Sequence, residues 1–283
     1  MPDLPHPKHA DVVFCIDRVM HYHLPMLAAV ERGLAKRGLG FAVLSGREIG
    51  GAVGRVASEE PAVRDHAYFR LSERAVSGFT LRVQHGLLRE LEARKPRVII
   101  SNCHSGTATE WLALLRARLR GARNVAWQCG YEYNPGVVKD LVLSRFIPLF
   151  DFHLCYHSNA KAYAMRYGAR EDQTLVMHNT IDESKIVPMD RLAARAVLEC
   201  RYPQLAGKRI VLHVGAVLAE KRIEQILDAL PLTGLDDPFF VLVGDGPHLP
   251  VLQERYGQRR DWLAAGRVVE GVGVFFDAAD VFV

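Results

Sequence analysis

Two adjacent cations, Lys221 and Arg222, follow the end of an apolar run and are candidates for binding an anionic ligand. The run Ile210–Val214 predicts a strand that ends at Gly215, and an amphipathic helix is predicted to begin near the cations. Glycine lets the backbone turn sharply and lets a ligand approach closely, and ligands of open α/β sheets bind beyond the carboxyl ends of strands. Cations oppose the dipole at the start of a helix, so an anion such as a diphosphate between them would explain their position. A solvated Lys-Arg turn is the alternative.

A second turn of the same kind follows the next apolar run, Phe239–Val243. Its residues are Gly244, Asp245, Gly246 and Pro247, and a helix is predicted after them. Pro247 fits the first position of that helix, and the two glycines keep the turn compact and its N–H groups approachable. The alternative is a plain turn with Asp245 as a cap. Two such turns on neighbouring strand ends favour a ligand site more than either turn alone.

Histidines follow two predicted strands in the first half of the chain. His21 and His23 come after the strand 12–16, and His104 comes after the strand 97–101. His21 and His23 could contact an acceptor molecule, or they could be surface residues of a loop. His104 could bond a sugar or a phosphate, or have a structural role at a helix start. The first strand lacks a following GxGxxG, which disfavours a dinucleotide-binding interpretation.

Polar and aromatic residues also follow the strand 124–127. Gln128, Tyr131 and Glu132 are candidates for lining a site, and packing is the alternative for each. Cys129 lies among them, but no His-Asp arrangement in the sequence supports it as a nucleophile.

Strands and helices alternate along the chain, which predicts an α/β fold with a parallel sheet covered on both faces. A connector over 182–208 with a helix at 189–199 separates two such alternations, so we expect domains at 1–185 and 186–283. The first contains predicted strands 12–16, 41–44, 66–71, 97–101, 124–127, 152–156 and 174–177 and helices 24–37, 73–93, 106–119, 136–149 and 159–167. The second contains strands 209–214, 239–243 and 280–283 and helices 222–230 and 248–257.

The ordered motifs resemble those of family 4 glycosyltransferases, which have the GT-B fold. The segments that resemble the C-terminal domain of that family are Gly215–Arg222, Val243–Pro247 and Ala278–Val283. In the first half, the loop His21–Pro25 resembles an acceptor-side loop, and His178–Asp182, which includes Asn179, resembles the turn before the inter-domain linker. The resemblance implies two Rossmann-like domains that face a cleft.

The resemblance also implies an activity. Such enzymes move a sugar from a nucleotide diphosphate sugar to an acceptor hydroxyl, usually with retention, without a metal and without a cofactor other than the donor substrate. It implies a hexosyltransferase in glycan or polysaccharide biosynthesis, acting on a glycan or a lipid-linked acceptor. Lys221 matches the family's diphosphate-binding lysine, and Arg222 beside it either assists or is solvated.

The sequence departs from the family pattern at several positions. Ala216 stands where many members have arginine, Cys129 stands where relatives often have histidine, and the segment after Arg267 is expected to be short. Two donor-binding glutamates, seven residues apart, should follow Val283. We therefore expect an incomplete second domain, and an inactive truncated fragment or a binding module is the alternative to an enzyme. A sugar-nucleotide epimerase of the same fold is a third interpretation.

The composition of the chain limits its expected binding partners and cellular location. The 36 Lys and Arg residues exceed the 32 Asp and Glu residues only slightly, and no pattern typical of nucleic-acid binding is present. The five cysteines form no CxxC pair, which disfavours disulfide and zinc frameworks and predicts a reducing cytoplasm. No apolar run is long enough for a membrane span. The apolar helix near 137–150 predicts core packing, with peripheral contact at the inner face of a membrane as the alternative. The oligomeric state stays open.

Overall fold

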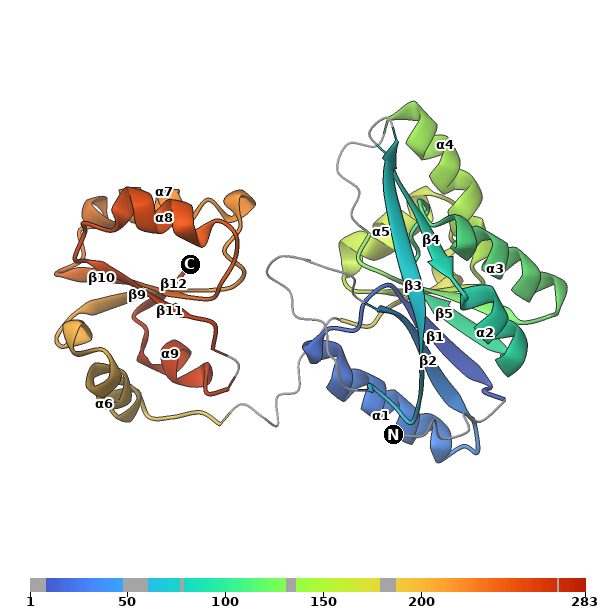
Figure 1. Cartoon of the computed structure of the whole chain (residues 1–283), viewed down its shortest axis with the longest axis horizontal. Coiled ribbons are helices and arrows are strands. Elements are labelled where there is room, and N and C mark those ends of the chain that lie inside the picture. The colour runs from blue at the N-terminus through green and yellow to red at the C-terminus, as the bar shows by residue number, and fades with distance from the viewer. Residues whose placement is uncertain (1–8, 48–60, 77–78, 131–135, 179–186, 269) are drawn as a thin grey trace. The chain divides into compact units, whose positions relative to one another are not determined.

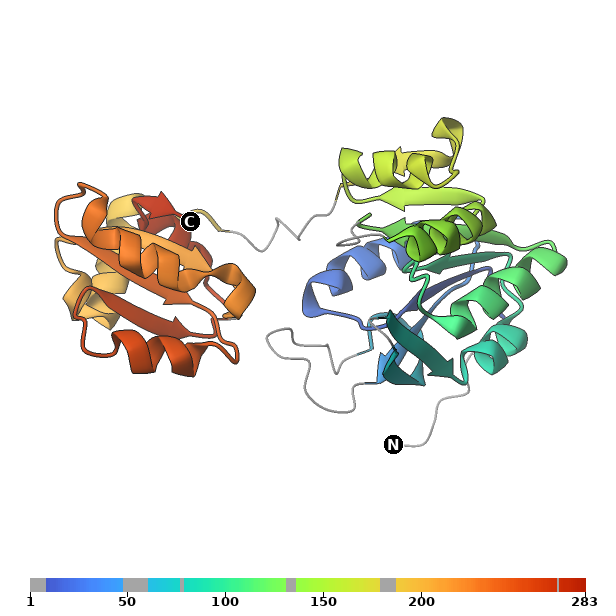
Figure 2. The same cartoon turned by 90° about the horizontal axis from the view of Figure 1, so that it is seen from above.

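The computed structural model describes residues 9–47, 61–76, 79–130, 136–178, 187–268 and 270–283. The described residues form two compact units, one up to residue 178 and the other from residue 187. Each unit is a sheet with helices on both faces (Figures 1 and 2).

The first unit contains an eight-stranded sheet in the order β4-β3-β2-β1-β5-β6-β7-β8. Neighbouring strands are parallel except β3 and β4, which form an antiparallel pair. The strands are β1 (Val12–Ile16), β2 (Phe41–Arg47), β3 (Asp65–Val76), β4 (Phe79–His85), β5 (Val98–Ser101), β6 (Arg123–Gln128), β7 (Phe152–Cys155) and β8 (Thr174–Val176).

Alternate residues of β1 face opposite layers of helices, as the period of a strand requires. Phe14 and Ile16 lie in one core with Leu27 of α1 (Leu24–Ala35). On the other face, Cys15 lies in a core with Leu91 of α2 (Leu87–Arg94) and with residues of α3 (Ala108–Leu119). Because both faces are covered, the strand is apolar throughout rather than alternating.

Two more helices cover the later strands of this sheet, α4 (Val137–Phe146) and α5 (Ser158–Arg166). Phe146 of α4 is fully buried, whereas Val137, Val138 and Leu141 of the same helix are exposed. Core packing therefore accounts for only one side of this apolar helix.

The predicted helix over 73–93 is wrong. Its first part belongs to β3 and β4, and only Leu87–Arg94 is helical. The segment 79–85 alternates between large and polar residues and pairs with β3, where Arg82 lies opposite Glu73 and their side chains form an ion pair of 2.9 Å. Gly86, with φ of 95°, separates β4 from α2. A tertiary pairing between the strands thus overrode the helical tendency of the charged residues.

The second unit contains a parallel four-stranded sheet in the order β11-β10-β9-β12. Helices α6 and α9 cover one face, and α7 and α8 cover the other. The strands are β9 (Arg209–Val214), β10 (Pro238–Val243), β11 (Trp262–Gly266) and β12 (Val281–Phe282), and the helices are α6 (Arg191–Arg201), α7 (Ile223–Ala229), α8 (Leu249–Tyr256) and α9 (Gly273–Ala278).

Strand β11 and helix α9 were absent from the prediction. The strand reads Trp-Leu-Ala-Ala-Gly, and alanine and glycine are depleted in strands. It forms because its backbone pairs with the buried β10.

Asp280 anchors the start of β12. Its carboxylate accepts a hydrogen bond from the backbone N–H of Ile210 (2.7 Å) and pairs with Arg209 (3.2 Å), Arg191 and Arg195. Desolvation raises the pKa of Asp280, but the N–H of Ile210 and the arginines outweigh it, so the pKa lies below its ordinary value. This arrangement assigns a structural role to part of the segment 278–283.

Candidate functional site

The turns that follow β9 and β10 are joined to each other by main-chain hydrogen bonds. Gly215 N–H donates to the carbonyl of Val243 (2.9 Å), and Val217 N–H donates to the carbonyl of Asp245 (3.0 Å). The N–H of His248 returns a bond to the carbonyl of Val217 (3.2 Å). The two turns that the sequence indicated therefore form one backbone structure at the carboxyl edge of the sheet, where ligands of such sheets bind.

The glycines of these turns differ in whether the surrounding atoms leave room for a side chain. A Cβ on Gly244 would lie 1.8 Å from the carbonyl oxygen of Gly215, and one on Gly246 would lie 2.2 Å from that of Val217. These two glycines are required by the contact between the turns. A Cβ on Gly215 would meet only Nε2 of His213, at 3.4 Å. Packing does not force a glycine at 215, so close approach of a ligand remains an explanation for that position alone.

Lys221 and Arg222 lie at the end of the first of these turns. Lys221 closes a short 3-10 helix (Ala219–Lys221), and Arg222, in the left-handed region with φ of 51°, precedes α7. Both are exposed, and among the described residues neither has an ion pair. With Gln225 they line a pocket of about 460 Å³ beside the end of β12.

One detail of the second turn differs from the prediction. Pro247 does not begin the following helix, because α8 starts at Leu249. His248 holds the preceding residues outside the helix. Its backbone N–H is hydrogen-bonded to Val217 in the first turn, and its ring is hydrogen-bonded to the carboxylate of Glu224 in α7. Asp245 is exposed, and its carboxylate accepts a hydrogen bond from the next backbone N–H (2.7 Å).

In the first unit, the carboxyl ends of β1 and β5 and the side chains of β4 form a polar cluster. Asp17, directly after β1, accepts a hydrogen bond from the amide of Gln84 (2.7 Å) and lies 3.6 Å from the guanidinium of Arg82. Nε2 of His104 is 3.9 Å from the same carboxylate. Desolvation lowers the pKa of His104, and Asp17 opposes that shift. A neutral, half-exposed imidazole beside a carboxylate can accept a proton from a hydroxyl.

Glu110 of α3 holds the loop that carries His104. Its buried carboxyl accepts hydrogen bonds from Oγ of Ser101 (2.6 Å) and from the N–H groups of Cys103 (3.0 Å) and His104 (3.1 Å). Burial raises the pKa of Glu110 to about 8, although the three bonds oppose the shift. Cys103 has a φ of 59°, a conformation that costs on the order of 1 kcal/mol in a non-glycine residue. The loop is therefore held in one particular shape.

Two other predicted residues of the first unit are buried. His23 is 7% exposed, and its Nδ1 accepts a hydrogen bond from the N–H of Met20 (3.1 Å), so the interpretation of His23 as a surface residue is wrong. Gln128 is 5% exposed, and its amide donates to Nδ1 of His153 (3.0 Å). The side chain of His21 and the residues Tyr131, Glu132 and Asn179 lie outside the described part of the structure.

Asp17, Arg82 and Gln84 were missed by sequence reasoning. Asp17 could have been found, because it occupies the first position after a buried strand, as Gly215 does. Arg82 and Gln84 could not, because the segment 73–93 was predicted to be a helix.

Among the described residues, no group of three or more His, Cys, Asp or Glu side chains could hold a metal ion. No described helix is both long and apolar enough to cross a membrane.

The sequence matches no protein-family model and no curated protein. The structure, in contrast, resembles several solved ones. Anabaena HepE, crystallised in complex with UDP, has a TM-score of 0.67 at 13% identity over 96% of this chain and 73% of that chain. A glycosyltransferase from Rickettsia africae has a TM-score of 0.65 at 12% identity over 98% and 73%. A UDP-N-acetylglucosamine 2-epimerase has a TM-score of 0.53 at 14% identity over 96% and 72%.

At these identities the likeness establishes the fold. The chain has the α/β architecture of GT-B glycosyltransferases, with a Rossmann-like sheet in each unit. The same architecture is found in the epimerase, so the fold does not by itself determine the chemistry.

Proposed function

We propose that this chain binds a nucleotide diphosphate sugar and belongs to an enzyme that transfers the sugar to an acceptor hydroxyl. The observation that carries the proposal is the joined pair of turns after β9 and β10, with Lys221 exposed beside it and without an ion pair among the described residues. An unpaired cation beyond the carboxyl edge of a parallel sheet is suited to a diphosphate.

Lys221 would neutralise the charge that develops on the diphosphate as the sugar leaves. Such electrostatic stabilisation of a leaving group is commonly the largest single contribution to catalysis. Gly215 would let the diphosphate approach the backbone, because its Cβ position has room. Arg222 is adjacent and would contribute less to diphosphate binding than Lys221. Its backbone, in the left-handed region, forms the turn from which α7 begins.

The cluster in the first unit would serve the acceptor. His104, with a lowered pKa and a carboxylate 3.9 Å away, has the properties of a group that orients a hydroxyl or accepts its proton. Asp17 would fix the orientation of the imidazole, and Arg82 would balance the carboxylate charge.

The donor half of the proposal can be tested by binding alone. Wild-type chain is titrated with UDP, GDP and ADP, and the shift of the midpoint of thermal unfolding is measured, because a ligand that binds only the folded state raises that midpoint. We expect at least one diphosphate to bind. Lys221→Ala should weaken it by about tenfold to a hundredfold, as expected for a lost bond to a charged group.

Arg260→Ala is the matched control. Arg260 is exposed and precedes β11, so it lies at the amino edge of the same sheet, away from the two turns. It should leave the affinity unchanged. Equal losses in both variants would indicate diffuse attraction by surface charge, and unchanged binding in Lys221→Ala would remove the assigned role of that lysine.

The likeness to a UDP-N-acetylglucosamine 2-epimerase favours a second candidate, isomerisation of the donor sugar. The two activities separate in one experiment, in which the nucleotide sugar is incubated without an acceptor. Isomerised nucleotide sugar would support the epimerase. Product that forms only when an acceptor glycan or lipid-linked sugar is present would support transfer.

The remaining parts of the proposed function rest on the resemblance in sequence to family 4 glycosyltransferases. Retention at the anomeric carbon, catalysis without a metal, a hexose as the transferred group and a role in glycan or polysaccharide synthesis are proposed on that basis. A cytoplasmic location with peripheral membrane contact is proposed as well, and the exposed Val137, Val138 and Leu141 of α4 support that contact.

A further inference from the structure

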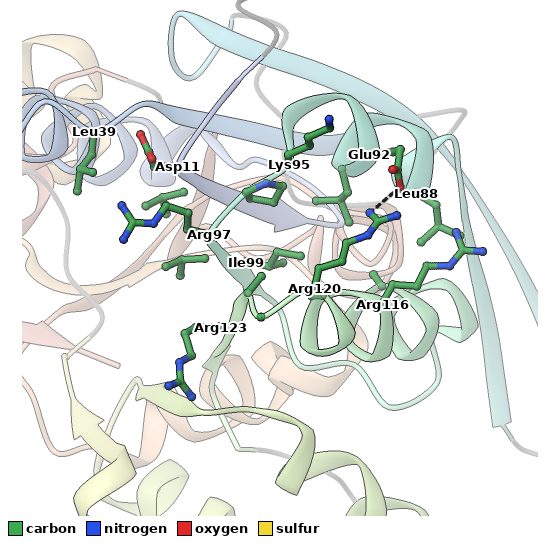
Figure 3. A pocket seen from close by; sticks show the side chains of 18 residues that line it. Asp11, Leu39, Leu88, Glu92, Lys95, Arg97, Ile99, Arg116, Arg120 and Arg123 are labelled. Carbon is green, nitrogen blue, oxygen red and sulfur yellow. Dashed lines mark ion pairs between the residues drawn. The ribbon is translucent and has the colours of Figure 1, made fainter.

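A pocket of about 680 Å³ opens at the amino edge of the first sheet, opposite the edge that carries Asp17 and His104. It lies where β1, β5 and β6 begin and between the last turns of α2 and α3 (Figure 3). From the start of β1 to Asp17 the strand spans about 16 Å. The pocket is therefore separate from the strand-end cluster.

The floor of the pocket is apolar. Leu91, Ile99, Ala113 and Ala117 line it and are each less than 9% exposed, and Leu88 lies beside them. Protein interiors are close-packed, with few voids larger than a water molecule. A hollow of this size over aliphatic side chains has the dimensions of a small-molecule site, which is typically about 300–1,000 Å³.

The rim of the pocket is strongly basic. Five cations line it, and two carboxylates, Asp11 and Glu92, accompany them. The cations are Lys95, Arg97, Arg116, Arg120 and Arg123. Figure 3 shows these five side chains spread around the apolar floor, with Arg120 paired to Glu92.

The two carboxylates are already engaged. Glu92 pairs with Arg120 (2.5 Å), and Asp11 accepts a hydrogen bond from the N–H of Gly40 (2.8 Å). Within the described residues, Lys95, Arg97 and Arg116 have no ion pair. The rim thus presents positive charge that no protein group neutralises.

Helix dipoles explain only part of this charge. Cations are favoured at the carboxyl ends of helices, which accounts for Lys95 after α2 and for Arg116 and Arg120 in the last turns of α3. Arg123, at the start of β6, is explained by an ion pair with Asp151 (3.0 Å), whereas Arg97, just before β5, has neither a helix end nor an ion pair among the described residues to explain it. Cations from helices and from strands surround the same apolar hollow, which points to a ligand with an apolar body and an anionic group.

We propose that this pocket binds a single-chain amphipathic anion, an acyl or alkyl chain that carries a phosphate head group. The chain lies on Leu88, Leu91 and Ile99, and the phosphate meets one of the two arginines that are unpaired within the described residues, Arg97 and Arg116, which lie on opposite sides of the pocket (Figure 3). A phosphate monoester carries a charge of about −1.5 to −2 at pH 7, which suits two or three unpaired cations. The site does not depend on the proposed sugar transfer, because it lies at the other edge of the sheet.

The probe is dodecyl phosphate, kept below its critical micelle concentration and titrated by calorimetry into the intact chain. Inorganic phosphate and dodecyl maltoside are titrated in parallel, to separate the head group from the chain. We expect saturable binding of dodecyl phosphate with one site per chain. We expect affinity at least tenfold lower for the other two molecules.

Variants locate the site. At least one of Arg97→Glu and Arg116→Glu should weaken dodecyl phosphate at least tenfold, and that variant marks the side of the pocket that holds the phosphate. The matched control is Arg118→Glu, which reverses the same charge on the same helix at an exposed residue that does not line the pocket. Its affinity should stay within about twofold of wild type, since residues two apart on a helix face different directions and Arg118 does not line the pocket.

Three results would overturn the proposal. Equal affinity for dodecyl maltoside would show that apolar contact alone drives binding. An equal loss in Arg118→Glu would show a diffuse charge effect. Binding only to vesicles that contain anionic phospholipid, with no response to the monomeric probe, would show a membrane-facing surface instead of a pocket for one molecule.

Discussion

The two units present their strand ends in different ways. In the second unit, the turns after β9 and β10 are joined through backbone groups, and Gly244 and Gly246 allow the contact. In the first unit, side chains shape the same edge: Asp17 bonds Gln84, and Glu110 holds the loop of His104. Backbone turns leave glycines that are visible in a sequence. A cluster of side chains from several separate elements gives no local motif in the sequence.

The difference has a consequence for how each unit responds to mutation and to pH. A backbone contact has no titratable group, and it fails when a Cβ is added. A side-chain cluster tolerates small changes of shape but responds to protonation. The two units should therefore be sensitive to different perturbations.

The largest effect is expected from Gly244→Ala. Its Cβ would lie 1.8 Å from the carbonyl oxygen of Gly215, and its φ of 149° is strained for any residue with a side chain. We expect the second unit to lose at least about 3 kcal/mol of unfolding free energy. Calorimetric or denaturant unfolding of the intact chain measures this loss.

Gly273→Ala serves as the control for that variant. Gly273 begins α9, and no atom lies within 4 Å of its Cβ position. Alanine there should be neutral or should stabilise by up to about 1 kcal/mol. If Gly244→Ala were no worse than Gly273→Ala, the joined turns would not be what holds this edge together.

The next effect concerns Glu110 and the pH. The pKa of about 8 in the folded state exceeds that of an exposed carboxyl, so the folded state keeps a proton that the unfolded chain releases. The contribution of Glu110 to stability is then fully present below about pH 4.5 and is lost as the pH rises through 8, on the order of 3 kcal/mol between pH 5 and pH 8. Because burial lowers the pKa of His66 and His153 to about 4 and their contribution to stability changes in the opposite direction, the quantity to measure is the difference in unfolding free energy between wild type and Glu110→Gln at pH 5, 6.5 and 8, and wild type should lose stability relative to the variant as the pH rises.

Glu171→Gln is the control for the pH series. Glu171 is an exposed carboxylate of the same unit, paired with Lys161 at 3.1 Å. Its profile should follow that of wild type. A Glu110→Gln chain that kept the full wild-type slope would mean that another group titrates in this range.

The smallest effect is expected from Asp17→Asn. Asp17 raises the pKa of His104 against desolvation, so removing its charge should lower that pKa further. Titration of the His104 ring signals by NMR measures the shift without any assay of activity. If the cluster serves an acceptor, kcat/KM for transfer should fall about tenfold, which corresponds to ~1.4 kcal/mol.

The midpoint of thermal unfolding should change little in Asp17→Asn, because the amide can keep a contact with Gln84. Asp172→Asn, which removes an exposed carboxylate that pairs with Arg170, should change neither the pKa of His104 nor turnover. A fall in turnover without any shift of the His104 titration would argue against coupling between the two residues.

Much of the fold could be read from the sequence. The buried strands β1, β5, β9 and β10 are continuous apolar runs, and the helices between them have amphipathic patterns, so the α/β class followed from local signals. The predicted helix 248–257 began one residue too early, because Pro247 suits a helix start and the partners of His248 lie far away in sequence.

Local sequence patterns gave wrong predictions where pairing between strands determined the secondary structure. The segment 73–93 has a helical composition, yet β3 and β4 pair across most of it. Strand β11 is weak by composition and exists through β10. Both errors have the same origin: a strand is stabilised by its neighbour, and the sequence of one strand does not contain that neighbour.

By itself, the sequence determined the alternation of strands and helices, the two glycine turns and the cations at 221 and 222, because each depends on residues close together in the chain. Only the tertiary structure brought Asp17, Arg82, Gln84 and His104 together, buried Glu110 beneath them, and placed the basic pocket at the opposite edge of the sheet. These features depend on contacts between distant segments and on burial, and burial is the main reason that the pKa of Glu110 is raised to about 8.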